Sequence, residues 1–89
     1  MLITLNKLGI KTQGATGKYI TKYYSYAREG SIIEDKHLVY RYDIDKLEEI
    51  AFQKIEQYEN LNGAFYRRAV KNANNLLNIL SKYREQLQQ

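Results

Sequence analysis

Residues 14–18, Gly-Ala-Thr-Gly-Lys, superficially resemble a loop that binds nucleotide phosphates. The full motif also needs a glycine at position 12 and a serine or threonine at position 19, where this chain has Thr12 and Tyr19. The motif further requires a parallel βαβ unit, and the 89 residues show no pattern for one. Nucleotide hydrolysis is therefore not expected.

Two pairs of carboxylates could in principle act as general acid and base: Glu48 with Glu49, and Asp43 with Asp45. Both pairs lie at the start of an expected helix, where N-capping and the helix dipole already favour acidic residues. A catalytic pair also needs a pocket, which the thin core of so short a chain hardly supplies. We therefore expect no enzymatic activity and no catalytic residue.

The chain has no cysteine and a single histidine, His37. Zinc fingers, iron–sulfur clusters, thiol nucleophiles and disulfide scaffolds are excluded by the missing cysteines. One histidine makes no His-rich metal site, and a serine–histidine triad would have to run through His37 alone. We expect no metal and no cofactor.

The length of 89 residues predicts one compact domain that buries only about 60% of its unfolded surface. No apolar run approaches the length of a membrane span, and the N-terminus does not read as a secretory signal. We expect a cytoplasmic protein with no membrane contact. Residues encoded by AT-rich codons are abundant, which points to a low-GC bacterium, its phage or a mobile element.

The excess positive charge lies entirely in the first half of the chain. Residues 1–42 hold seven Lys/Arg and three Asp/Glu, whereas residues 43–89 hold seven of each, so the formal net charge of +4 belongs to the first half. Six of the nine tyrosines also lie before residue 43. A basic region interleaved with tyrosine suits contact with nucleic-acid phosphates and sugars. A solvated surface with no partner is the alternative.

The first 30 residues predict two helical segments and a loop. Residues 2–10 read as a short helix capped by Thr4 and ended by Gly9, or as a strand through Ile3 and Leu5. Residues 11–17 are a glycine-containing loop. Residues 16–30 read as a helix capped by Thr16 and ended by Gly30. Its apolar stripe consists of Ile20, Tyr23, Tyr24 and Ala27, and its outer face is basic.

Residues 31–42 change to a period of two and predict a β-hairpin with a polar turn at residues 34–36, close to His37. A helix then spans about 46–59, capped by Asp43 or Asp45, and residues 60–63 break it. The last helix, about 64–86, carries an apolar seam in steps of three and four. The seam could pack on the 46–59 helix as a hairpin within one chain. We expect it instead to bind a second copy or another protein, because a helix of about fourteen residues cannot cover it. The seam residues are Tyr66, Ala69, Ala73, Leu76, Leu80, Tyr83 and Leu87.

Residues 23–32, Tyr-Tyr-Ser-Tyr-Ala-Arg-Glu-Gly-Ser-Ile, and residues 40–50, Tyr-Arg-Tyr-Asp-Ile-Asp-Lys-Leu-Glu-Glu-Ile, carry a resemblance. Together with the order of elements, they resemble the MerR/excisionase-like winged helix-turn-helix group over residues 20–50. The resemblance implies a mainly α fold with a small β-hairpin, that is, a winged helix-turn-helix followed by a helical hairpin or a long C-terminal helix. The winged module would span 1–44, and the packing or dimerisation region 45–89.

The resemblance further implies double-stranded DNA as partner, with helix 16–29 in the major groove and a wing at 34–38 on the adjacent backbone or minor groove. It assigns DNA contacts to Lys18, Lys22, Tyr26, Arg28, Lys36, His37 and Arg41. The exposed helix face lacks Arg, Asn and Gln, so direct readout of bases is expected to be weak.

Two functions follow from these patterns. The first is a small DNA-binding protein of a phage, plasmid or mobile element, acting as an excisionase-like, partition or transcription factor. The second is a protein-interaction module, an accessory subunit of a nucleic-acid enzyme or a phage-encoded inhibitor, that uses the 64–87 helix.

Overall fold

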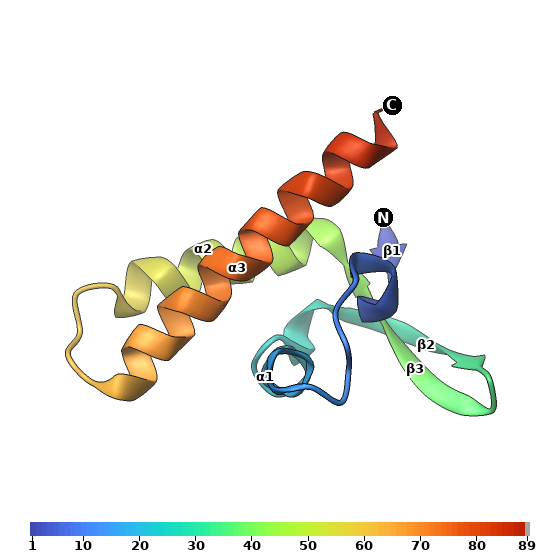
Figure 1. The fold of residues 1–89 in the computed structure, drawn as a ribbon, viewed down its shortest axis with the longest axis horizontal. Coiled ribbons are helices and arrows are strands. Elements are labelled where there is room, and N and C mark those ends of the chain that lie inside the picture. Colours follow the sequence, from blue (N-terminus) through green and yellow to red (C-terminus); the bar gives the residue numbers. More distant parts are fainter. Residues whose placement is uncertain (89) are drawn as a thin grey trace. The chain divides into compact units, whose positions relative to one another are not determined.

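The computed structural model describes residues 1–88 and shows a mainly helical chain with a small three-stranded antiparallel sheet (Figure 1). The chain divides into two compact units, Met1–Leu47 and a second unit that begins at Glu48. The elements are β1 (Leu2–Ile3), the 3₁₀ helix η1 (Leu5–Leu8), α1 (Ala15–Tyr23), the 3₁₀ turn η2 (Ser25–Ala27), β2 (Arg28–Glu34), β3 (His37–Asp43), α2 (Ile44–Tyr58) and α3 (Ala64–Leu87).

The predicted hairpin is confirmed. Strands β2 and β3 pair antiparallel, with Ile33 opposite Leu38 and Glu34 opposite His37, and β1 pairs with the end of β3 to give the order β1-β3-β2. Asp35 and Lys36 form the turn with φ of 50° and 67°. Two positive φ values match the twist of the flanking strands, and an aspartate tolerates this region better than most residues.

The helix predicted over 16–30 is wrong in its C-terminal half. Helix α1 begins after Gly14 rather than at a Thr16 cap and ends at Tyr23, and the chain joins β2 at Arg28. The 3₁₀ turn Ser25–Ala27 and the pairing of Arg28 with Tyr42 across the sheet replace the last part of the predicted helix. Gly30 is therefore not a helix end: it lies in an irregularity between Arg28 and Ser31, with φ of +90°. Here the pairing of strands overrides the local helical periodicity of the sequence.

At the N-terminus, each alternative for residues 2–10 is realised in part: the strand includes Ile3 but not Leu5, and the helix is a single 3₁₀ segment. A two-residue strand, β1, precedes η1, and Thr4 occupies the N-cap position without a side-chain hydrogen bond. Gly9 ends η1 in the left-handed conformation, as predicted. Leu5 and Leu8 of η1 are both buried.

The core of the first unit combines residues from β1, η1, the loop after it, α1, η2, β3 and the first turn of α2. Ile20, Tyr24 and Ala27 are buried as predicted, although Tyr23 is only half-buried. Burial, together with the neighbouring Tyr19, raises the pKa of the Tyr24 phenol far above its ordinary value, so this side chain stays neutral. The remaining core residues are Ile3, Leu5, Leu8, Ile10, Tyr42, Ile44 and Leu47.

Asp43 caps α2, which begins at Ile44, two residues before its predicted start. The Asp43 carboxylate accepts a hydrogen bond of 3.1 Å from the Lys46 backbone N–H, so Asp45 lies inside the helix instead of capping it. The predicted break at residues 60–63 is confirmed, because α2 ends at Tyr58 and α3 begins at Ala64.

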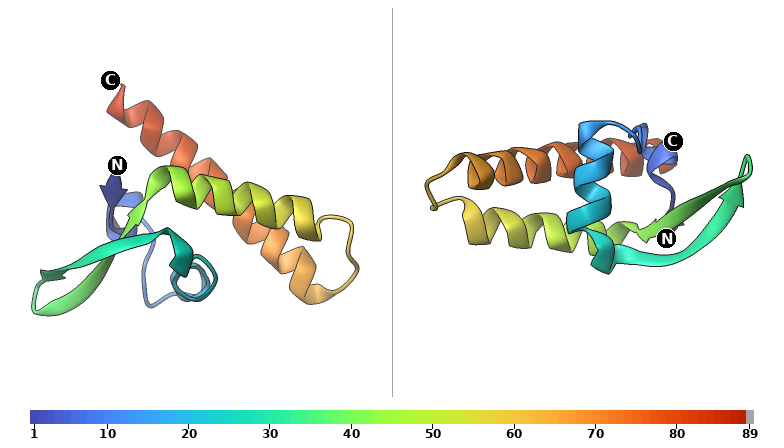
Figure 2. Two further views of the ribbon diagram at one scale, coloured as in Figure 1. Left: turned by 180° about the vertical axis from the view of Figure 1, so that it is seen from behind. Right: turned by 90° about the horizontal axis from the view of Figure 1, so that it is seen from below.

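Helices α2 and α3 form an antiparallel hairpin (Figure 2). At the loop end, the ring of Tyr58 lies 5.3 Å from that of Tyr66, measured between centroids. At the opposite end, Arg84 Nε lies 3.6 Å from a carboxylate oxygen of Glu48. No helix within residues 1–88 has the length and apolar character that a membrane span requires.

The apolar seam of α3 is less exposed in the single chain than expected. Ala69, Ala73, Leu76 and Leu80 are buried in the single chain. Tyr66 and Tyr83 are half-buried, and only Leu87 is exposed, at 51%. The expected need for a second molecule is therefore wrong for the inner four residues of the seam, which are buried within the single chain.

Candidate nucleic-acid interface

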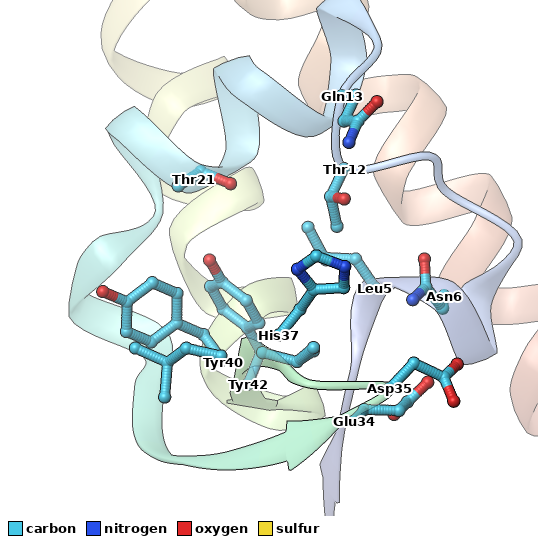
Figure 3. Close-up of a pocket in the computed structure, with 12 residues that line it drawn as sticks. Leu5, Asn6, Thr12, Gln13, Thr21, Glu34, Asp35, His37, Tyr40 and Tyr42 are labelled. Carbon is cyan, nitrogen blue, oxygen red and sulfur yellow. The ribbon is translucent and has the colours of Figure 1, made fainter.

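A groove of about 430 Å³ lies in the first unit, between the β2–β3 hairpin on one side and η1, the following loop and α1 on the other (Figure 3). His37 projects from the hairpin toward Thr12, and Tyr40 and Tyr42 line the groove near Thr21. Most of its polar side chains are uncharged donors and acceptors. The lining residues are Leu5, Asn6, Thr12, Gln13, Thr21, Glu34, Asp35, His37, Leu38, Val39, Tyr40 and Tyr42.

Each of the four segments that line this groove carries a lysine next to a lining residue. Lys7 belongs to η1, Lys11 to the loop, Lys22 to α1 and Lys36 to the hairpin turn. All four are exposed, and within residues 1–88 none forms an ion pair. Lys18, on α1, is likewise exposed. The segments that line the groove therefore carry exposed lysines without a carboxylate partner, although no lysine lines the groove itself.

Two acidic residues of the first unit, Glu29 and Asp43, form hydrogen bonds or ion pairs with other groups of the chain. The Glu29 carboxylate accepts a hydrogen bond from Lys46 Nζ, and this bond raises the pKa of the Lys46 ammonium. Asp43 caps α2 and lies 3.9 Å from the N-terminal ammonium. Glu34 and Asp35 are exposed and line the groove at the tip of the hairpin. Their negative charges offset part of the positive charge of the lysines in this region.

The predicted contact residues occupy several different elements. Lys18 and Lys22 are exposed on α1, and Lys36 and His37 are exposed at the hairpin turn, where His37 lines the groove. Tyr26 is 86% exposed, but it lies in the 3₁₀ turn η2 and not on the outer face of a long helix.

Arg28 was expected at the end of a helix and is instead the first residue of β2, where its guanidinium joins α1 to β3. It donates hydrogen bonds to the Thr21 carbonyl and, at 3.2 Å, to the Tyr42 hydroxyl. Its central carbon lies 4.2 Å from the centroid of the Tyr40 ring. These contacts use the planar, multiply donating shape of arginine to hold the base of the hairpin against the helix.

Replacing Arg28 with lysine is expected to lower the free energy of unfolding by about 1–2 kcal/mol, because lysine keeps the charge but cannot reproduce the planar fork. Urea denaturation followed by circular dichroism measures the change. The matched control is Arg68→Lys, an exposed position, where the change should stay within about 0.5 kcal/mol. Equal stability of both variants would show that the Arg28 bridge contributes nothing.

Arg41 is half-buried on β3 and lies across Gly30 of the neighbouring strand. A Cβ atom at residue 30 would stand 3.1 Å from Arg41 Nη2, so the glycine leaves room for the guanidinium. Arg41 Nε is buried and has no hydrogen-bond partner among the described residues. This arginine is therefore partly enclosed, in contrast to the lysines.

Of the twelve groove residues, only His37 was a predicted contact. The others include four neutral polar residues opposite the hairpin: Asn6, Thr12, Gln13 and Thr21. Their side chains can donate to phosphate or sugar oxygens, which is the usual role of neutral polar residues at nucleic-acid interfaces. They lie in a 3₁₀ turn, in a loop and on a helix flank, so no periodic pattern connects them. Only the folded arrangement places them around one groove.

Comparisons of the chain with protein-family models, with curated proteins and with solved structures give no match. The assignment of function therefore depends on the geometry and charge of the chain itself.

Proposed function

We propose that the chain is a non-enzymatic DNA-binding protein whose first unit is a winged helix-turn-helix. In this proposal, α1 enters the major groove and the β2–β3 hairpin is the wing. The order of elements supports it: β1, two helical segments, a hairpin and a capped helix follow one another. The short strand β1 pairs with the end of β3, so the hairpin is part of a three-stranded sheet.

The observation that carries the proposal is a set of exposed lysines in the segments that line the groove. Lys7, Lys11, Lys22 and Lys36 come from four separate segments, yet each is adjacent in sequence to a groove residue. Lysines that are not neutralised internally attract the phosphates of DNA and release condensed counterions on binding. Neutral donors between them would fix the position of the backbone.

The recognition chemistry favours the backbone over the bases. The exposed cations of α1 are Lys18 and Lys22, and lysine acts on phosphate as a point charge. Gln13, just before α1, is the one side chain near the helix start that pairs well with adenine. We therefore propose a protein of a phage, plasmid or mobile element that binds duplex DNA with modest sequence preference.

The Lys22→Ala and Lys36→Ala substitutions are each expected to weaken binding to short duplex DNA several-fold. Each should also reduce the slope of log affinity against log salt concentration by about one, because one phosphate contact is lost. Fluorescence anisotropy over a salt series measures both quantities.

Lys82→Ala is the matched control, because it makes the same change in net charge on an exposed residue of α3, outside the first unit. It should leave the slope unchanged. Absence of DNA binding at low salt would refute the proposal. Unchanged slopes for both Lys22→Ala and Lys36→Ala would refute the assignment of helix and wing.

A further inference from the structure

The two long helices carry opposite charges, which the zero net charge of residues 43–89 conceals. Helix α3 holds five Lys/Arg and one acid, Glu85, whereas α2 holds four acids and two lysines. Three cations of α3 lie within its first eight residues: Arg67, Arg68 and Lys71. All three are exposed, so the start of α3 is a basic surface of the second unit.

A second groove, of about 400 Å³, lies beside these cations. Tyr58, Leu61 and Val70 supply its apolar lining, and Arg67 and Lys71 its cations. Leu61 is 46% exposed, and Phe65, whose ring lies 6.1 Å from that of Tyr58, is 47% exposed, so apolar surface remains uncovered at this end of the helical hairpin. A groove that combines apolar floor, tyrosine and arginine has the composition of a protein-binding site.

Asn74 and Asn75 extend the polar side of the groove along α3. Lys71 follows Arg67 by four residues, and Asn74 and Asn75 follow Lys71 by three and four. This spacing places them on one helix face. The stretch from residue 67 to residue 75 spans about 12 Å along the helix axis. That length matches about four residues of extended peptide, whose backbone the two side-chain amides can hydrogen-bond.

We propose that this groove binds an acidic peptide segment that carries an apolar side chain between its carboxylates. The carboxylates pair with Arg67 and Lys71, and the apolar side chain packs against Leu61 and Val70. Arginine suits this role because its guanidinium binds a carboxylate through two parallel hydrogen bonds. The site lies in the second unit and is separate from the DNA interface proposed for the first.

The contacts of Tyr58 favour a peptide over a single-stranded nucleic acid. Its ring lies 6.1 Å from that of Phe65, 5.3 Å from that of Tyr66 and 5.8 Å from Lys54 Nζ. Because these neighbours surround the ring, it offers a poor platform for a stacked base, on which such binding depends.

The test uses the full chain and a fluorescent peptide in which Leu and Phe alternate with Asp and Glu. Arg67→Gln and Lys71→Gln are each expected to weaken binding about tenfold, measured by anisotropy. Arg68→Gln and Lys82→Gln are matched controls, because they remove the same charge from exposed positions that do not line the groove. Both should stay within about twofold of the unmodified chain.

Two peptide variants test the two halves of the proposed chemistry. Changing every Asp and Glu to the amide should abolish binding, and changing Leu and Phe to alanine should weaken it about tenfold. The Lys22→Ala and Lys36→Ala variants should bind the peptide normally, which separates this site from the DNA interface.

Three results would overturn the proposal. The first is a lack of binding by the acidic, apolar peptide. The second is an equal loss of affinity in Arg67→Gln and Arg68→Gln, which would reflect charge without a groove. The third is binding of oligothymidylate that competes with the peptide and is lost in Arg67→Gln, which would make the groove a nucleic-acid site. Circular dichroism of each variant verifies that it is folded.

Discussion

Replacing Gly17 with alanine is expected to destabilise the first unit by about 3 kcal/mol. A Cβ atom at this position would lie 2.1 Å from the Lys11 carbonyl oxygen and 2.6 Å from Thr12 Cα. Both are backbone atoms, so no rotation of a flexible side chain relieves the overlap. Helix α1 and the loop before it would have to separate, and both line the groove of the proposed DNA interface.

The direction of the stability change at Gly17 distinguishes steric overlap from helix propensity. Glycine within a helix is usually worse than alanine by about 1 kcal/mol, so the intrinsic preference alone predicts stabilisation. Urea denaturation followed by circular dichroism gives the difference in unfolding free energy, and hydrogen exchange at the amides of α1 shows whether the loss is local.

Gly14→Ala is the matched control for this substitution. Gly14 has φ of −78°, and its added Cβ would stand 3.5 Å from the same Lys11 oxygen, an ordinary contact. The change in stability should therefore be smaller than about 1 kcal/mol, the usual scale for an N-cap position. A Gly17→Ala chain as stable as the unmodified one would mean that the loop does not cross α1 at this point.

Replacing Leu80 with alanine is expected to cost about 2–5 kcal/mol of unfolding free energy. Leu80 is fully buried, and alanine would remove its apolar contacts and leave a cavity. Thermal or urea unfolding by circular dichroism measures the loss.

Leu87→Ala is the control within the same seam, because Leu87 is 51% exposed and should change the stability by less than about 0.5 kcal/mol. Protein concentration supplies a second criterion. If the single chain buries Leu80, the melting temperature should not depend on concentration. A melting temperature that rises with concentration would instead indicate that copies of the chain share the seam.

The lysines of the candidate interface could be predicted from the sequence, whereas its neutral hydrogen-bond donors could not. The lysines at 18, 22 and 36 follow from the uneven charge of the chain and from helical and hairpin periodicity, and all three are exposed. The neutral donors Asn6, Thr12 and Gln13 follow from no pattern, because turns and loops lack a period that would reveal which side chains converge. The arginines illustrate the same limit, since Arg28 is held by internal hydrogen bonds that its position in sequence does not reveal.

By itself, the sequence determined the hairpin turn, the end of η1 at Gly9, the break before α3 and the apolar faces of the helices, because each depends on neighbours within a few residues. Tertiary structure decided where α1 stops, since pairing of Arg28 with Tyr42 is a contact between distant residues. It also decided that Leu76 and Leu80 are covered within one chain. A period specifies which face is apolar, but only packing determines what that face meets, because burial depends on the path of the whole chain.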